Sequence, residues 1–231
     1  MADDQKELDQ KELTLGDIEQ EWKETGSRIE ETVLACLKEQ YQREFEITRT
    51  AVSPGEMLVR LYARRTDAEE LPFLVHMDAE GMITDQYVRR LVLSPLCHEA
   101  EKRFPGIRMT AAILEDPSVP EYDTSLTLFE YLRKHEVDRI VADVIIDEES
   151  GAAAEAMLPF FEEESCSLGA ELVVDFRILQ TEKYERAARM FSITPEVSDA
   201  FLAHFDPLKL YAGVIREGKS DFTELEVMTD G

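Results

Sequence analysis

The sequence predicts an α+β fold, in which a helix packs on an antiparallel meander and a second, ferredoxin-like α+β layer follows. In residues 27–105, apolar residues first repeat at helical spacing and then alternate as in half-buried strands. In residues 106–231, strand-like runs alternate with helix-like runs, which is typical of crossover units on one sheet. We therefore expect three parts: an acidic tether or frayed helix over 1–26, a helix-plus-meander domain over 27–105, and a second α+β domain over 106–231.

The elements of the first half follow from local signals. Gly26 interrupts a charged segment, and Ser27 and Glu30 then have the spacing of a capping box, so a firm helix is expected from Ser27 to Tyr41. Turn chemistry at 53–55 separates two runs of β-like residues, which favours a hairpin. Strands are expected over 45–48, 57–64 and 73–77, followed by a helix over 83–92 and a second one from Ser94-Pro95 to residue 104.

The second half changes rhythm at Pro105-Gly106. Asp123 and Ser150 are each expected to cap a helix, because short polar side chains satisfy the free N–H groups at helix starts. Strands are expected over 107–114, 137–146, 172–179, 210–215 and 222–227, and helices over 124–135, 152–165, 182–191 and 195–205.

Charge sets the first limit on function. The 231 residues include 50 Asp and Glu but only 25 Lys and Arg, so the formal net charge is −25. Such a chain repels nucleic acids and anionic membranes, so we expect no nucleic-acid partner. Its acidity suits a basic protein partner or cations, although solubility alone would also account for it. No apolar run reaches membrane-spanning length, which predicts no transmembrane segment.

A resemblance to known proteins rests on the segment from Leu71 to Tyr87, where a strand, an acidic glycine turn and an Asp-x-Tyr helix entry follow one another. This pattern resembles small uncharacterised lipoproteins of Gram-positive bacteria, which place a helix before a cystatin-like meander. Some of those proteins look like immunity proteins carried beside secreted toxins. The start of the chain, Met1-Ala2-Asp3-Asp4, lacks the regions of a signal peptide, so a cytoplasmic location is expected; the alternative is a membrane-anchored extracytoplasmic protein whose native leader was removed.

No motif in the sequence predicts catalysis, a cofactor or a metal. Cys97 and His98 are adjacent, so on a helix their side chains diverge and do not form a nucleophile and base pair. The three cysteines have apolar neighbours and are expected to be ordinary buried thiols. The acidic run at 147–149 invites a calcium interpretation, but its spacing does not match a calcium loop, and a strand-to-helix turn accounts for it better. Paired carboxylates of a hydrolase are a further alternative.

The distribution of charge points to one candidate binding surface. Between Arg139 and Arg177 there are ten acidic residues and no basic ones, whereas basic and acidic residues balance from Arg49 to Arg108. Acidic side chains late in a helix oppose the helix dipole, so helix stability does not explain the run at 162–164. The partner-binding candidates in this acidic region are Asp147, Glu148, Glu149, Glu162, Glu163 and Glu164.

A second candidate surface is the non-core face of the meander, where Arg60, Tyr62 and Arg64 alternate with core residues and His76 follows on the next strand. Arg and Tyr are common anchors of protein interfaces. This face is either open to a partner or covered by another part of the chain.

We interpret the sequence as that of a non-enzymatic binding protein, with a toxin-neutralising immunity or inhibitor protein that uses an acidic surface as the leading version. The alternative is an exported, lipid-anchored accessory protein of the cell envelope, and a carboxylate-dependent hydrolase is the third hypothesis.

Overall fold

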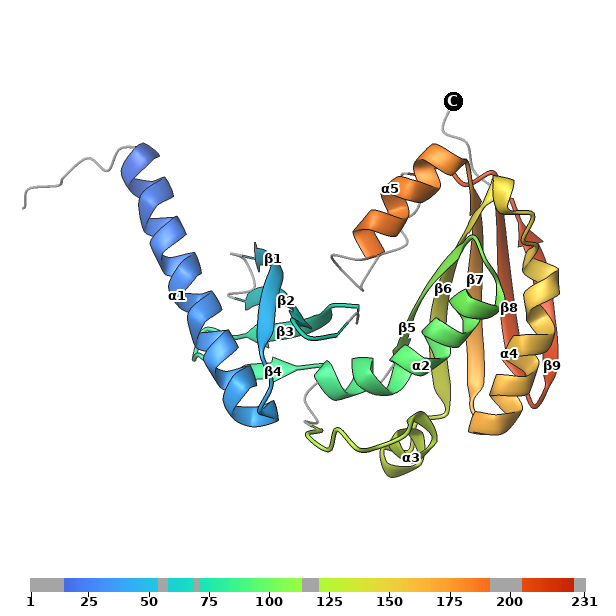
Figure 1. Cartoon of the computed structure of the whole chain (residues 1–231), viewed down its shortest axis with the longest axis horizontal. Coiled ribbons are helices and arrows are strands. Elements are labelled where there is room, and N and C mark those ends of the chain that lie inside the picture. Colours follow the sequence, from blue (N-terminus) through green and yellow to red (C-terminus); the bar gives the residue numbers. More distant parts are fainter. Residues whose placement is uncertain (1–14, 54–57, 69–70, 114–120, 192–204, 227–231) are drawn as a thin grey trace, which may run out of the picture.

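The computed structural model describes residues 15–53, 58–68, 71–113, 121–191 and 205–226. These residues form two sheets joined by a helix, and the α+β class is confirmed. The four-stranded sheet has the order β1-β2-β3-β4, and the five-stranded sheet has the order β5-β6-β7-β8-β9. The two sheets lie in separate lobes at the two ends of α2 (Figure 1).

The N-terminal lobe is a helix on an antiparallel meander, as expected. It contains α1 (Leu15–Tyr41), β1 (Phe45–Ser53), β2 (Leu58–Arg65), β3 (Phe73–Met77) and β4 (Ile83–Asp85). Its core includes a group of edge-on aromatic rings, in which Tyr87 lies 4.7 Å from Tyr41 and 5.2 Å from Phe45 between ring centroids. Edge-to-face contacts of this kind stabilise a core beyond the apolar area that they bury.

The capping box at Ser27 is a wrong prediction, because α1 begins at Leu15 and continues through Gly26. A glycine inside a helix costs only about 1 kcal/mol relative to alanine. The packing of Val33 and Leu37, which are fully buried, outweighs that cost. The predicted apolar face of this helix is otherwise confirmed.

A single helix, α2 (Tyr87–Arg103), replaces the two helices expected between residues 83 and 104. Residues 83–85 form β4 instead, and the Asp85 carboxylate accepts a hydrogen bond from the Tyr87 N–H at 2.9 Å at the helix start. Pro95 lies inside α2 and does not end it. Proline removes one helical hydrogen bond, here to the Leu91 carbonyl, and this loss is offset by packing, since Val92, Leu93 and Leu96 are all buried.

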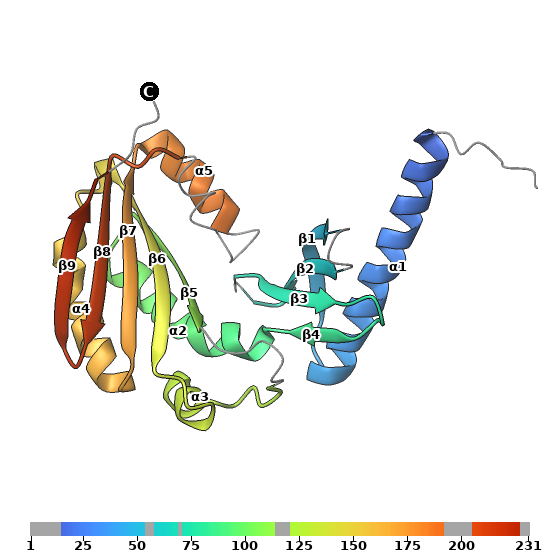
Figure 2. The ribbon, with the colours of Figure 1, turned by 180° about the vertical axis from the view of Figure 1, so that it is seen from behind.

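The C-terminal lobe is a mixed sheet with helices on both faces. Its strands are β5 (Ile107–Ile113), β6 (Arg139–Asp147), β7 (Glu171–Leu179), β8 (Lys209–Arg216) and β9 (Lys219–Leu225), and its helices are α3 (Leu128–Lys134), the 3-10 turn η1 (Glu148–Ser150), α4 (Ala154–Leu168) and α5 (Thr181–Phe191). Figure 2 shows α2 and α4 behind this sheet and α5 across one end of the other face.

The ferredoxin-like detail of the predicted fold is not found. In a split βαβ arrangement another strand separates the two parallel strands. Here β6 and β7 pair directly in parallel, from Arg139 with Glu171 to Asp147 with Leu179, and every other pair in this sheet is antiparallel. The α4 crossover returns the chain to the adjacent position, so the strands follow sequence order across the sheet.

Two predicted helix caps are also wrong. Asp123 accepts hydrogen bonds from the backbone and hydroxyl of Ser125 in a loop, and α3 begins later, at a capping box between Thr127 and Glu130. Ser150 donates to the Asp147 carbonyl at 2.6 Å and ends the 3-10 turn, so α4 starts without a side-chain cap. Both residues close local turns before the chain reaches the helix.

One apolar cluster extends through both lobes, from Val33 of α1 along α2 to Ile215 of β8. The expected domain boundary at 105/106 falls in the turn between α2 and β5. The division of the chain into two domains there stays a prediction. A second, smaller cluster joins Ile145 and Leu179 to Ala187 and Phe191 of α5, on the opposite sheet face. Of the tether or frayed helix predicted over 1–26, residues 15–26 belong to α1. Residues 1–14 of it, the turn at 54–55 and most of the helix predicted at 195–205 lie outside the described residues.

Candidate functional site

A groove of about 540 Å³ lies between α2, the start of α3 and α4, and it includes one of the predicted acidic residues, Glu164. We call it the helical groove. Seven of its ten lining residues are apolar, and two are glutamates. The lining residues are Leu91, Val92, Pro95, Leu96, Glu99, Leu126, Thr127, Leu128, Glu164 and Leu168.

The floor of the helical groove belongs to the protein core, whereas its walls are only partly covered. Val92 and Leu96 are buried in the core, and Leu126, Leu128 and Leu168 are partly buried against the same core. Because α3 is only seven residues long, its own helical propensity does not hold it in place. The groove therefore depends on contacts that fix α3 against α2.

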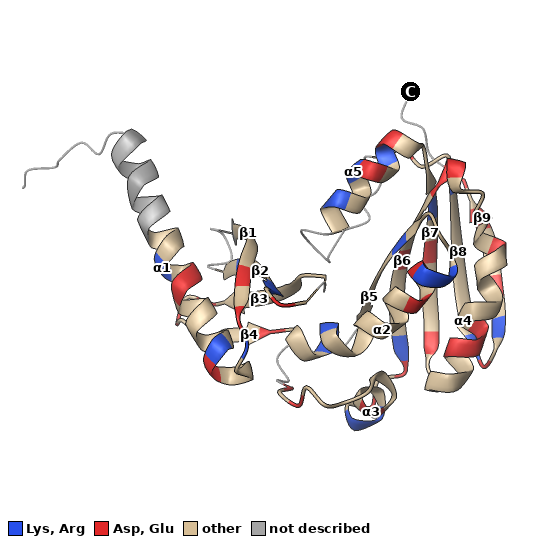
Figure 3. Ribbon diagram, viewed as in Figure 1, with Lys and Arg blue, Asp and Glu red and all other residues tan. Residues whose placement is uncertain are grey.

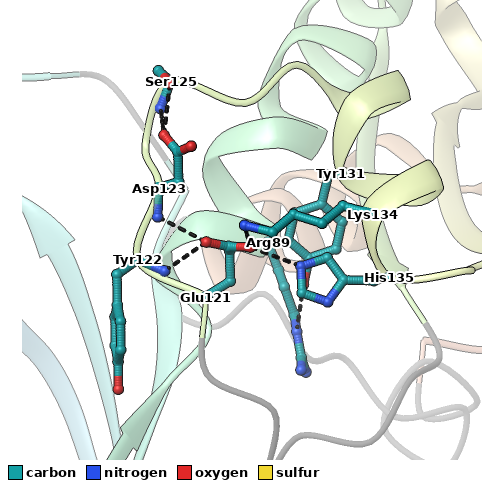
Figure 4. Close-up of polar contacts among 8 residues, drawn as sticks. All are labelled: Arg89, Glu121, Tyr122, Asp123, Ser125, Tyr131, Lys134 and His135. Atoms are coloured by element: carbon teal, nitrogen blue, oxygen red, sulfur yellow. Dashed lines mark hydrogen bonds and ion pairs between the residues drawn. The ribbon is translucent and has the colours of Figure 1, made fainter.

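A polar network around Glu121 first holds α3 to the loop that precedes it (Figure 4). One carboxylate oxygen of Glu121 accepts hydrogen bonds from the backbone N–H groups of Tyr122 and Asp123, both at 2.9 Å. The other oxygen lies 2.6 Å from the Lys134 ammonium and 2.8 Å from His135 Nε2, at the end of α3. The carboxylate thus ties the loop before α3 to the end of that helix.

A second contact joins α3 to α2. Arg89 of α2 donates from Nε to the hydroxyl of Tyr131 at 3.1 Å, and the Tyr131 ring stacks on His135 with centroids 4.3 Å apart. Tyr131 is fully buried and Arg89 nearly so. A buried charged hydrogen bond of this kind favours one arrangement of its partners, because losing the partner leaves a desolvated charge.

The pKa of Glu121 reflects this network. Burial by itself raises the pKa of the Glu121 carboxyl. Hydrogen bonds from Lys134, from the Asp123 backbone and from His135 outweigh this effect and lower the pKa to about 2. The carboxylate therefore stays ionised well below neutral pH, and its ties to α3 persist there.

The rim of the helical groove is acidic. Glu99 pairs with Lys102 at 3.6 Å, and both side chains are more than half exposed. Glu164 has no ion pair within the described part of the chain. Burial raises the pKa of Glu164, and the negative charges of Glu163 and Glu99 raise it further. The groove therefore combines an apolar floor with a carboxylate whose local charge is unbalanced.

The structure separates the three glutamates predicted as one acidic patch. Glu162 points to β9 and accepts a hydrogen bond from Ser220 at 2.7 Å. Glu163 is exposed and lies 3.7 Å from Arg103 of α2. Glu164 lines the helical groove. Neighbours on a helix differ by about 100° in direction, so a run of three in sequence does not make a single surface.

The other acidic candidates lie at the opposite end of α4. Asp147 accepts a hydrogen bond from Thr181 at 2.7 Å and another from the Glu149 backbone, so it has a structural role at the end of β6. Glu148 and Glu149 are exposed on η1. These three residues are not brought together with Glu162–Glu164.

The acidic window between Arg139 and Arg177 is partly neutralised by arginines at or beyond its ends. Glu171 pairs with Arg139 and Arg216, and Arg177 pairs with Asp143 on the neighbouring parallel strand. Figure 3 shows acidic residues in both lobes, with both signs of charge on α5. The local negative charge of this window is thus smaller than its sequence indicates, because strand pairing places arginines from its ends and from β8 beside its carboxylates.

The candidates on the meander lie together on the face away from α1. His76 is directly opposite Arg60 across β2 and β3, and Arg49 lies over the Tyr62 ring at 5.9 Å. Tyr62 is only 8% exposed, so the centre of this face is covered. Burial and the charge of Arg60 lower the pKa of His76. Arg64 pairs with Glu46 at 2.6 Å and borders a cavity between the lobes.

The cysteines do not all follow the prediction. Cys97 is buried, and burial raises the pKa of its thiol to about 11, which disfavours the reactive thiolate. Cys166 is exposed and Cys36 is intermediate, so the expectation of three buried thiols is wrong for these two. Among the described residues, no group of three His, Cys, Asp or Glu side chains is arranged to hold a metal, and no helix is long and apolar enough to cross a membrane.

Sequence reasoning did not identify the helical groove. Its walls come from three segments separated by more than twenty residues, and only tertiary packing brings them together. One local signal was available, since Thr127 and Glu130 have capping-box spacing with Leu126 and Leu128 beside the cap. Leucines beside a helix start are typical of a surface that packs against something else.

Comparisons with known proteins support the fold. No family profile and no curated protein matches the sequence. A solved structure of a DUF5037 family protein from Ruminococcus gnavus ATCC 29149 is similar, with a TM-score of 0.67 and 17% sequence identity. The alignment covers 84% of this chain and 94% of that chain. At this identity the similarity shows the fold alone.

Proposed function

We propose that the protein is a non-enzymatic binding protein that docks a basic amphipathic helix of a partner protein in the helical groove. The observation that supports this proposal is the combination of an apolar floor with Glu99 and Glu164 at the rim. An amphipathic helix places apolar anchors on one face, and flanking Lys or Arg side chains would pair with the two glutamates.

The electrostatics favour a basic partner over an acidic or neutral one. Burial of the Glu164 carboxylate beside Glu163 and Glu99 disfavours its charged form, as its raised pKa reflects. A cation from a partner would relieve this repulsion, and the overall charge of −25 would speed the encounter. The negative potential of the groove rim would make a basic segment bind here more tightly than to an uncharged apolar surface.

The direct test uses a labelled peptide of about 18 residues, or five turns, made of Leu and Lys with leucines on one helical face. Binding is measured by fluorescence anisotropy at low and at high salt. We expect Glu164→Lys to weaken binding by about tenfold or more, since it replaces attraction by repulsion inside the groove. Leu126→Ser should also weaken binding, because it removes apolar contact.

The matched control is Glu155→Lys, which makes the same charge change on the exposed first turn of α4, away from the groove. It should change the affinity by less than about threefold. Equal losses in the two variants would show that the peptide responds only to net charge. That result would refute docking in the helical groove. The same conclusion would follow if a peptide with Ser in place of Leu bound with the same affinity as the Leu peptide.

The immunity version of this proposal makes the partner a toxin whose active surface is occluded. Its support is the resemblance of residues 71–87 to immunity-like proteins, together with the acidic groove. Co-purification with the product of the neighbouring gene tests it. If that product does not bind at low salt, while the peptide does, the immunity version is excluded and docking in the helical groove is retained.

A further inference from the structure

A second site lies between the two lobes, on the other side of α2 from the helical groove. It is a cavity of about 460 Å³, lined by residues of β1, β2, the segment after β2, α2 and β5. We call it the interlobe cavity. Its lining contains Arg64, Arg65 and Arg108 but only two glutamates, Glu46 and Glu101. A cationic lining is unexpected in a chain with a net charge of −25.

The three arginines are held in position by carboxylates. Arg65 binds Asp67 through two parallel contacts at 2.9 and 3.0 Å, and its side chain is 18% exposed. Arg108 donates to Glu101 at 2.8 Å, while the other oxygen of Glu101 accepts from the Met109 backbone at 3.0 Å. Glu101 therefore braces α2 against β5, and Arg108 is fixed at the cavity wall.

Two of these arginines retain donors for a ligand. A guanidinium has five N–H groups. Within the described residues, Arg64 uses only its Nε, toward Glu46, and Arg108 uses only one terminal nitrogen, toward Glu101. Both residues line the cavity, and their side chains are partly exposed, 43% for Arg64 and 53% for Arg108.

The rest of the lining adds polar side chains and an apolar wall. Ser94 and His98 lie one turn apart on α2, with the hydroxyl 3.5 Å from His98 Nδ1. Leu71, Ala68 and the buried Cys97 supply apolar surface. A cavity of this size, with convergent donors beside apolar groups, is typical of a small-molecule site.

We propose that the interlobe cavity binds a small organic anion, with a phosphate or carboxylate group held by Arg64 and Arg108 and a compact apolar body against Leu71. A guanidinium group can donate two parallel N–H groups to a pair of oxygens on either a carboxylate or a phosphate. The site is independent of the helical groove, because the two share no lining residue.

The experiment measures the binding of phenyl phosphate to the full chain by calorimetry or ligand-observed NMR, at about 0.15 M salt so that long-range repulsion is screened. Benzoate tests the carboxylate, inorganic phosphate tests the need for an apolar body, and phenol tests the need for charge. We expect phenyl phosphate or benzoate to bind more tightly than inorganic phosphate and phenol.

The ion pair between Arg64 and Glu46 provides two variants with opposite expectations. Arg64→Gln removes the cation and should weaken binding by about tenfold. Glu46→Gln removes the competing carboxylate and should strengthen binding by about twofold to threefold. Both residues are more than 40% exposed, so neither change should unfold the chain, and circular dichroism checks this.

Opposite effects of the two variants would support the proposal. Equal weakening in both would show that the ion pair acts only through structure and would overturn it. Failure of both phenyl phosphate and benzoate to bind would also overturn it. Binding of inorganic phosphate alone, with no gain from the phenyl group, would refute the apolar part of the site.

Discussion

The substitution Glu121→Gln tests whether the polar network holds α3 in place. Glutamine keeps an oxygen for the two backbone N–H groups but turns an amide donor toward Lys134 and His135. The contact with the half-exposed Lys134 is worth about 1 kcal/mol. The contact with His135 is worth about 1.5–3 kcal/mol, because the side chains of His135 and Glu121 are only 10% and 8% exposed. We therefore expect a loss of about 3 kcal/mol, or a fall in Tm of about 6–12 °C for a chain of this length.

The effect of this substitution depends on pH, and scanning calorimetry measures it. The folded pKa of Glu121 is about 2, below the ordinary 4.5, so its stabilisation is fully present above pH 4.5 and is lost as the pH falls through 2. The gap in Tm between the two proteins should shrink over that range. As the control, Glu148→Gln on exposed η1 should shift Tm by less than about 2 °C. A Tm gap at neutral pH no larger than the control's would refute the reasoning.

Three further predictions concern stability, and urea denaturation checks each one. Phe161→Ala should cost about 3–5 kcal/mol, because this fully buried ring of α4 packs against Phe176 of β7, and an unchanged midpoint would contradict this packing. Gly106→Ala should cost at least about 2 kcal/mol, since the glycine has φ +86° and an added Cβ would lie 2.1 Å from the Ser150 Cβ; Ser150→Gly should recover part of the loss. Arg177→Met should cost about 3–5 kcal/mol, because it removes the buried cation beside the Asp143 carboxylate, and adding Asp143→Leu should restore most of it; no recovery would show that the pair does not explain the loss.

The sequence predicted most elements correctly where apolar periodicity was strong. Val33, Leu37 and Tyr41 share a helical face, and the alternation around Leu61 and Ala63 marks a strand with a buried side. These patterns are reliable because side-chain direction follows directly from helical or extended backbone geometry. The hairpin and the meander were accessible for the same reason.

The errors occurred where local signals competed with packing. Gly26 and Pro95 both look like helix ends, but α1 and α2 continue through them. Each residue carries a local cost of limited size, and the burial of neighbouring apolar side chains exceeds it. Propensity alone cannot weigh that burial, because it depends on what lies opposite the helix.

The sequence by itself determined the α+β class, the strong acidity and the amphipathic faces, since these depend on composition and on spacing within single segments. Only the tertiary structure decided which charges meet. It dispersed Glu162, Glu163 and Glu164 around α4, paired Arg177 with Asp143 across parallel strands, and brought Glu164 into a groove with leucines from α2 and α3. The physical reason is that electrostatic and apolar contacts act over a few ångströms in space, whatever the separation along the chain.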